Sequence, residues 1–253
     1  MTTNPHAHHR LAGRIAVVTG AGTGIGAATA AALSAAGAQV ALLGRRPDPL
    51  HAQADQLGGL AISADVRDRD RLAAAFDQAR ATHGPADLVV ANAGQMLPAT
   101  FATADPEEWR RMLDINVLGL ADTARLAIPD LLNAAANGKP ADLVLVSSIG
   151  AHLTMDKYAV YMATKAAVSH LARGLRLELG VHGVRVRAIE PGMTASDLAH
   201  DASDQAAKRE LAEFRDRVPP IGAEMIAEAI AWSCALPADT NASVLEVLPT
   251  VQG

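Results

Sequence analysis

Short apolar runs alternate with longer alanine-rich stretches along most of the chain. The apolar runs predict strands at residues 15–19, 39–43, 60–64, 87–91, 142–147, 184–189 and 244–248. The stretches between them predict helices at residues 24–36, 68–82, 106–135, 158–180 and 223–235. Several strands are apolar throughout, which is typical of a parallel sheet covered on both faces. The pattern therefore predicts a doubly wound α/β fold, with helices on both faces of a seven-stranded parallel sheet.

The chain has 253 residues and no linker, repeat or change of composition that would mark a second domain. We expect one domain over residues 11–253, preceded by a flexible polar tail at 1–10. Residues 192–220 are polar and charged, and they are too long for an ordinary connection. We interpret them as a partly helical lid over a ligand site. The alternative is a solvated excursion without a role.

Charge and cysteine content exclude several classes of partner. A net charge of −5 argues against nucleic acid, and no apolar run approaches the ~18 to 20 residues of a membrane span. The single cysteine, Cys234, excludes an internal disulfide and a cysteine-rich metal site. His6, His8 and His9 have no carboxylate or cysteine partner nearby, so we expect a polar tail and no metal. These features favour a cytoplasmic protein.

A glycine-rich turn joins the first predicted strand to the first predicted helix. Its sequence, from Thr19 to Gly26, is Thr-Gly-Ala-Gly-Thr-Gly-Ile-Gly. Glycines allow a tight turn and a close approach to a pyrophosphate, while the helix N-terminus supplies free N–H groups. A plain strand-to-helix turn is the alternative, but the position at the start of a βαβ chain favours a nucleotide site. The predicted site comprises Gly20, Gly22, Thr23, Gly24, Ile25 and Gly26.

The end of the second strand indicates which dinucleotide binds. A carboxylate at this position would bind the ribose 2′-hydroxyl of NAD, but the chain has Arg45 and Arg46 there. Two guanidiniums can bind a 2′-phosphate, so NADP(H) is favoured over NAD(H). The alternative is that both arginines are solvated in a loop. Later strands add supporting candidates at their ends, namely Asp65, Val66, Asn92, Ala93 and Gly94.

Tyr161 and Lys165 are four residues apart on a predicted helix and therefore share one face. A cation beside a phenol favours the phenolate, so we expect Lys165 to lower the pKa of Tyr161. Such a tyrosine can act as a general acid and base near neutral pH. Ser148 lies thirteen positions before the tyrosine. Asn116 lies inside an apparent helix, where asparagine is mildly unfavourable and needs a reason.

Taken together, these residues resemble the short-chain dehydrogenase/reductase family along nearly the whole chain. The matching positions are the glycine-rich turn at 19–26, Asp65, Asn92-Ala93-Gly94, Asn116, Ser148, Tyr161, Lys165 and Pro191-Gly192. One departure is Ala91, where family members often have a second asparagine. A narrower resemblance, at 189–194 and 248–252, is to the NADP-dependent branch that includes clavulanate-pathway aldehyde reductase. Serine- and 3-hydroxy-acid-type dehydrogenases lie near that branch.

The resemblance implies a Rossmann-type fold and an NADPH-dependent oxidoreductase that reversibly reduces an aldehyde or ketone on a small polar or natural-product substrate. In this pattern Tyr161 protonates the carbonyl oxygen, Ser148 stabilises it, Lys165 holds the tyrosine and the nicotinamide ribose, and Asn116 anchors a water. Pro191, Gly192 and Thr194 would complete the cofactor site. His152 and Met193 are further candidates for substrate contact, although a loop histidine without a catalytic role is an equal alternative.

The family also pairs the helices near 106–135 and 158–180 across a two-fold axis, so the resemblance implies a homodimer or homotetramer. Burial of these helices within one subunit is the alternative. Two other functions stay open at this point. One is a non-catalytic NADP-binding redox sensor, and the other is an epimerase or dehydratase that retains its cofactor.

Overall fold

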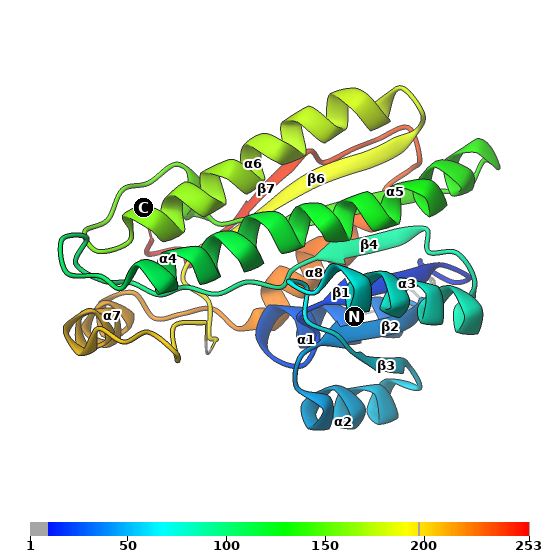
Figure 1. Cartoon of the computed structure of the whole chain (residues 1–253). Helices are drawn as coiled ribbons and strands as arrows, with labels where there is room; N and C mark the ends of the chain where they lie inside the picture. Colours follow the sequence, from blue (N-terminus) through cyan, green and yellow to red (C-terminus); the bar gives the residue numbers. More distant parts are fainter. Residues whose placement is uncertain (1–9, 197, 253) are drawn as a thin grey trace, which may run out of the picture.

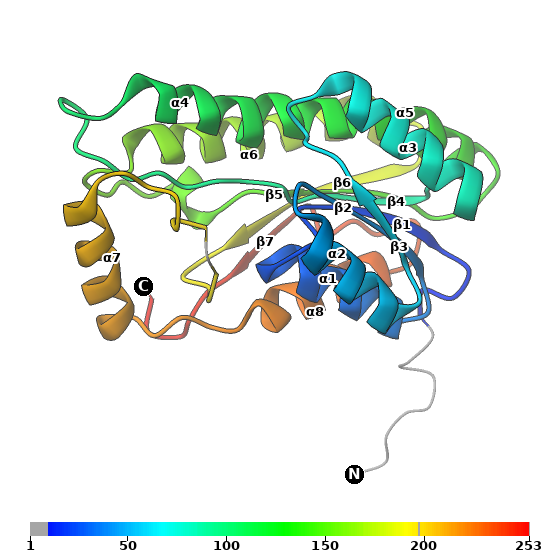
Figure 2. The same ribbon diagram turned by 60° about the horizontal axis from the view of Figure 1, so that its bottom comes forward.

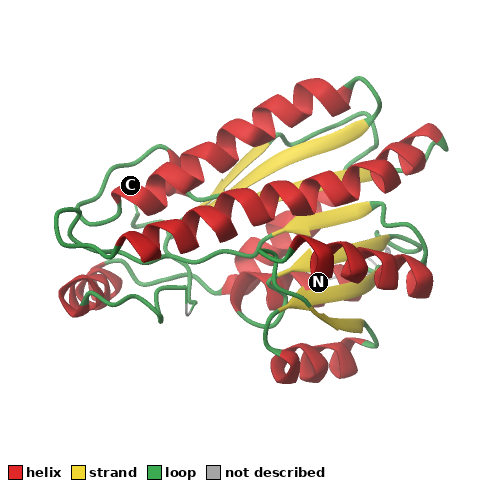
Figure 3. Ribbon diagram, in the orientation of Figure 1, coloured by secondary structure: helices red, strands yellow, loops and turns green. Residues whose placement is uncertain are grey.

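The computed structural model describes residues 10–196 and 198–252, so the predicted tail at 1–10 lies outside the described residues except for Arg10. A seven-stranded sheet has the order β3-β2-β1-β4-β5-β6-β7, and every neighbouring pair is parallel (Figures 1 and 3). The strands are β1 (Ile15–Thr19), β2 (Gln39–Gly44), β3 (Leu60–Ser63), β4 (Leu88–Ala91), β5 (Ala141–Val146), β6 (Val184–Pro191) and β7 (Val244–Val247). The predicted doubly wound fold is confirmed.

Helices cover both faces of the sheet (Figure 2). One layer contains α3 (Arg69–His83), α4 (Pro106–Leu113), α5 (Leu120–Ala136) and α6 (Ala159–Gly180). The opposite layer contains α1 (Gly24–Ala35), α2 (Pro47–Leu57) and α8 (Ala223–Cys234). Successive side chains of a strand point to opposite faces, so Val17 packs with the first layer while Ala16 and Val18 pack with the second. The fully apolar strands are therefore explained by burial on both sides.

The observed strands begin and end within two residues of the predicted ones, but two helical features differ. The helix expected at 106–135 is interrupted by a π-helical turn, η2 (Asp114–Gly119), between α4 and α5. Helix α2 was not predicted, because its sequence is polar and contains Pro47 and Pro49. Its first proline occupies the first turn, where no intrahelical N–H is needed, and therefore begins the helix without breaking it.

Buried charges connect the strands at the end of the sheet where the strands begin. Asp142, in β5, is fully buried and pairs with Arg187 and, at 2.8 Å each, with Arg14 and Arg185. Arg14 also lies 2.6 Å from Asp87, just before β4. A buried charge is tolerated only when it is paired, so these contacts constrain how β1, β4, β5 and β6 align. At the opposite edge of the sheet, where the strands end, lie the loops that connect the strands to the following helices.

The long connection after β6 contains the helix α7 (Gln205–Arg217), as expected for a partly helical segment. Asp204 begins this helix by accepting hydrogen bonds from the N–H groups of Ala206 and Ala207. Figure 2 shows α7 beyond the ends of β6 and β7. Lys157, before α6, pairs with Glu210 and ties α7 to the first helical layer. Within the described ranges, no helix is long and apolar enough to cross a membrane.

Candidate active site

The glycine-rich turn depends on glycine at particular positions. Gly20 and Gly24 have φ angles of +68° and +56°, a region that side chains other than glycine rarely adopt. A Cβ atom on Gly26 would lie 2.2 Å from the carbonyl oxygen of Gly20, so only glycine permits this close packing. Asn92 closes the turn from β4, since its Nδ2 donates to the carbonyl oxygen of Thr19 at 2.9 Å.

Helix α1 begins without a side-chain cap. Helices α3 and α4 begin at Asp68 and Asp105, whose carboxylates accept from backbone N–H groups of the first turn. Thr23, at the start of α1, makes no such bond, and the first turn of α1 contains no acidic residue. The Thr23 hydroxyl instead accepts from Arg46 Nη2 at 3.0 Å. The free N–H groups and the helix dipole therefore fit a pyrophosphate.

An open cleft adjoins this turn. It is lined by the predicted cofactor residues Gly20, Gly22, Thr23, Gly24, Ile25, Arg45, Arg46, Asp65, Val66, Asn92, Ala93 and Gly94. Burial raises the pKa of Asp65, but the hydrogen bonds and charge of Arg67 outweigh it and bring that pKa below its usual value. The Arg67 guanidinium lies 2.6 Å from the Asp65 carboxylate and pairs with it. Arg45 and Arg46 also line the cleft, and their positive charge faces it. These residues fit a nicotinamide dinucleotide.

Ser148, Tyr161 and Lys165 line a second pocket, which shares Ile25, Asn92 and Gly94 with the cofactor cleft. Ser148 follows β5, and its hydroxyl accepts from the N–H of Gly150 at 3.0 Å. Tyr161 and Lys165 come from the first turns of α6, as their spacing predicted. The Lys165 ammonium donates to the carbonyl oxygen of Val146 at 2.9 Å and lies 5.9 Å from the centre of the Tyr161 ring. The fold therefore gathers these three residues around one space.

Asn116 lies in the π-helical turn η2, between α4 and α5. The regular helix is interrupted there, which explains why an asparagine is found inside an apparent helix. Its Oδ1 accepts from the N–H of Gln95 at 2.8 Å, and its Nδ2 donates to the Gln95 carbonyl and to the Thr164 hydroxyl. The side chain is fully buried and joins the loop after β4 to helix α6. A Cβ atom on Gly94 would lie 3.4 Å from Asn116 Oδ1 and 3.7 Å from Lys165 Nζ, so these groups converge.

The sequence predicted that Lys165 lowers the pKa of Tyr161, and this prediction is wrong for the protein by itself. Burial raises the pKa of Tyr161 to about 12, although a hydrogen bond with Ser148 lowers it. Burial also lowers the pKa of Lys165 to about 8. Both side chains are less than a tenth exposed, and removal from water disfavours the charged form of each. Tyr161 is therefore a neutral hydroxyl at pH 7.

The pocket beside Tyr161 has largely apolar walls. Met193, predicted to contact substrate, lines it, and so do Pro191, Gly192 and Thr194. The sequence interpretation missed Leu211, Phe214 and Arg215 from α7, and Gln252 near the C-terminus. The spacing of Leu211 and Phe214 by three residues places them on one face of α7 and was a signal for the first two. No sequence signal pointed to Gln252, whose Oε1 accepts from the N–H of Met193 at 2.7 Å.

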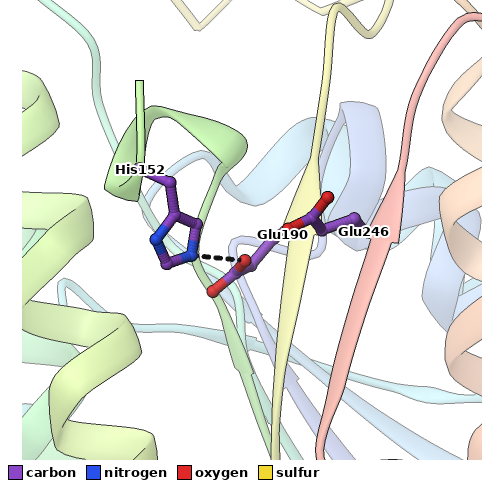
Figure 4. A group of neighbouring side chains, drawn as sticks. All are labelled: His152, Glu190 and Glu246. Atoms are coloured by element: carbon purple, nitrogen blue, oxygen red, sulfur yellow. Dashed lines mark hydrogen bonds and ion pairs between the residues drawn. The ribbon is translucent and has the colours of Figure 1, made fainter. Parts of the chain in front are cut away.

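His152 does not line this pocket, in contrast to its predicted contact with substrate. Its Nε2 lies 2.9 Å from Oε2 of Glu190, a fully buried carboxylate in β6 (Figure 4). Glu190 also accepts from the Ser169 hydroxyl at 2.7 Å. Glu246, in β7, completes a group whose ligand atoms all lie within 4.8 Å of one another, a spacing that a metal ion could bridge. The arrangement pairs His152 with Glu190, and a contact between His152 and substrate stays a prediction.

A family model described as short chain dehydrogenase matches residues 14–207. An uncharacterized oxidoreductase of Staphylococcus aureus (strain N315) is 35% identical over 244 residues, which cover 94% of this chain and 98% of that protein. A 3-ketoacyl-(acyl-carrier-protein) reductase from Brucella melitensis, solved with NADH, has a TM-score of 0.86 and 29% identity, covering 95% of this chain and 99% of that chain. The closed form of a serine dehydrogenase, solved with NADP+, has a TM-score of 0.85 and 28% identity, covering 94% and 96%.

The chain therefore belongs to the short-chain dehydrogenase/reductase family. It is an oxidoreductase of that family, and its fold binds a nicotinamide cofactor. The two structural relatives hold different cofactors, so the choice between NADH and NADPH must come from this chain's own residues.

Burial of Lys165 gives a prediction about stability. Below pH 8 the folded protein holds a buried ammonium, whereas the unfolded chain holds its proton up to about pH 10.4. Stability of the wild type should therefore rise as the pH increases from about 8 to 10. We expect Lys165→Met to raise the free energy of unfolding by about 1–3 kcal/mol at pH 7, and by less at pH 9.5.

Urea denaturation at both pH values measures this difference. The exposed Lys139 supplies a control, since Lys139→Met should leave the free energy of unfolding unchanged at either pH. If Lys165→Met were less stable than the wild type at pH 7, this would contradict the prediction that burial of the ammonium lowers the free energy of unfolding.

Proposed function

We propose that the protein is an NADP(H)-dependent oxidoreductase that reversibly reduces an aldehyde or ketone to an alcohol, on a small polar or natural-product substrate. The observation that carries this proposal is the convergence of Ser148, Tyr161 and Lys165 on one pocket beside the cofactor cleft. A redox sensor would need the cleft but would have no use for a buried phenol and ammonium in a separate pocket. Net consumption of NADPH distinguishes reduction from epimerisation or dehydration.

In the proposed mechanism the cofactor, when bound, supplies the hydride for reduction or accepts it in the reverse direction. Tyr161 donates its hydroxyl proton to the carbonyl oxygen as negative charge develops there. The Ser148 hydroxyl donates a hydrogen bond to the same oxygen. Lys165 returns a proton toward Tyr161, and the pKa of Lys165 near 8 makes that amine able to exchange protons close to neutral pH. Asn116 positions the loop and the helix that carry these groups.

The preference for NADP(H) rests on Arg45 and Arg46. Both line the cofactor cleft, and Arg46 is held against Thr23 at the start of α1. A guanidinium binds a phosphate through paired, charge-assisted hydrogen bonds, whereas a ribose hydroxyl gains much less from it. In this proposal Gly20, Gly22 and the N-terminus of α1 would hold the pyrophosphate, and Asp65 and Val66, which line the same cleft, would contact the adenine.

The segment at 192–220 is proposed to act as a lid. Residues of α7 form one wall of the substrate pocket, and Lys157–Glu210 anchors the helix. We also propose a homodimer or homotetramer, since Leu113, Leu118 and Leu177 are about half or more exposed on the helices expected to pair. A cytoplasmic location stays a prediction.

Removal of one oxygen atom tests the role of Tyr161. Tyr161→Phe should lower kcat for NADPH-dependent carbonyl reduction by about 10²–10⁴-fold, because the carbonyl oxygen loses its proton donor. Oxidation of NADPH, followed by absorbance against a panel of aldehydes and ketones, measures this. Tyr158→Phe is the matched control, since Tyr158 lines the same pocket one turn earlier, and it should lower kcat by less than about tenfold. Equal losses in the two variants would remove Tyr161 from the role of acid.

Charge reversal at Arg45 tests the cofactor assignment. Arg45→Asp should raise the dissociation constant for NADPH by at least about tenfold, since a carboxylate would repel the 2′-phosphate, and should change that for NADH far less. Fluorescence titration of both cofactors gives the two constants. Arg110→Asp, with the same change of net charge on an exposed side chain outside the cleft, is the control. Equal weakening of both cofactors would defeat the NADP(H) assignment.

A further inference from the structure

Among the described residues that line the substrate pocket, two are cations and none is a carboxylate. Among the residues that line it, only Lys165 and Arg215 carry a charge, and most other walls are apolar. The apolar wall is formed by Leu153, Met155, Met162, Met193, Leu198, Leu211 and Phe214. Lys165 is committed to the Val146 carbonyl and the catalytic tyrosine. Arg215 is therefore the charge that the proposed reduction leaves without a role.

Arg215 lies on α7, and its guanidinium is only partly used by the protein. Its Nη2 donates to the carbonyl oxygen of Ser196 at 3.0 Å, which fixes the side chain against the segment after β6. Its Nε is buried and has no hydrogen-bond partner among the described residues. Many other arginines of the described chain pair with a carboxylate, as Arg14, Arg67 and Arg80 do, but Arg215 forms no such pair there. Its Nη1 makes no hydrogen bond with the described residues and is not among the fully buried atoms, so this nitrogen can still bind a ligand.

Arg215 lines the same pocket as Ser148, Tyr158 and Tyr161. Tyr158 precedes Tyr161 by three residues at the start of α6, so the two phenols are neighbours on one helix. Because Arg215 and Tyr161 line one pocket, we expect that one substrate can contact both side chains.

We propose that Arg215 binds a carboxylate of the substrate, which is then an aldehyde or ketone that carries a carboxylate on a short apolar chain. A guanidinium and a carboxylate form charge-assisted hydrogen bonds, and the Nη1 of Arg215, which makes no hydrogen bond with the described residues and is not fully buried, is available for one of them. A phosphate fits less well, because a second negative charge would enter an apolar pocket without a second free cation. This inference rests on the proposed function and names the substrate class of the same site.

The carboxylate takes no part in the proposed reduction. The carbonyl carbon gains the hydride, the electron pair of the C=O π bond moves to oxygen, and that oxygen takes the proton of Tyr161. The product is a hydroxy acid whose carboxylate is still bound to Arg215. Reduction of a carbonyl acid, or oxidation of the matching hydroxy acid with NADP+, is the same reaction in its two directions.

Matched pairs of substrates test the proposal. The kcat/KM with NADPH is measured for a series of ω-oxo acids of increasing chain length and for the methyl ester of each. The wild type should favour the acid over its ester by about 10–100-fold at the best chain length, the range expected for a charge-assisted hydrogen bond. Arg215→Met should remove that preference mainly by raising KM for the acid, while the ester is affected far less. Arg215→Lys should restore part of the preference.

Arg217→Met is the control, because Arg217 is exposed on the same helix and does not line the pocket. It should keep the wild-type preference for the acid. Turnover of the esters with no preference for the acids, or an equal loss for acid and ester in Arg215→Met, would overturn the role of Arg215 and leave the reductase intact. No consumption of NADPH with any acid, ester or simple aldehyde would overturn the proposed function itself. Melting temperatures of the variants separate misfolding from loss of binding.

Discussion

The parallel direction of all seven strands is the constraint on which the rest of this structure depends. Because every strand ends at the same edge of the sheet, the loops that follow β1, β2, β4, β5 and β6 lie together although they are far apart in sequence. The glycine-rich turn, Arg45, Asn92 and Ser148 all come from these loops. The buried ion pairs of Asp142 lie at the other end of the sheet, away from the candidate active site. Ion pairs thus align the strands where they begin, and the candidate active site is formed where they end.

Burial then decides the chemistry of the two groups that α6 brings to this edge. Tyr161 and Lys165 are both removed from water, so each favours its neutral form more than it would in solution. A neutral phenol is the form that can protonate a carbonyl oxygen, and an amine with a pKa near 8 can gain or lose a proton close to neutral pH. We expect burial of the Lys165 ammonium to lower the free energy of unfolding, as is common for charged groups at active sites.

Much of the fold and of the site follows from local sequence patterns. The strands are recognisable because they are apolar at successive positions, and the cofactor turn because four glycines in seven residues, Gly20 to Gly26, have few other uses. Tyr161 and Lys165 follow from helical spacing. The positions that sequence missed depend on contacts between distant segments. Helix α2 begins at a proline in a polar stretch, and the π-helical turn is occupied by an asparagine that bonds to Gln95 and Thr164. His152 faces Glu190, which no local pattern indicates.

The measurement that tests the account most directly is the fate of the transferred hydrogen. NADPH carrying deuterium at the reactive position of its nicotinamide is incubated with the protein and an aldehyde or ketone that it consumes, and the product is analysed by mass spectrometry and NMR. The account predicts an alcohol with deuterium on the former carbonyl carbon, and none of this product from Tyr161→Phe at the same protein concentration and time. An alcohol whose new C–H hydrogen comes from water, or tight NADPH binding without transfer to any carbonyl compound, would contradict it.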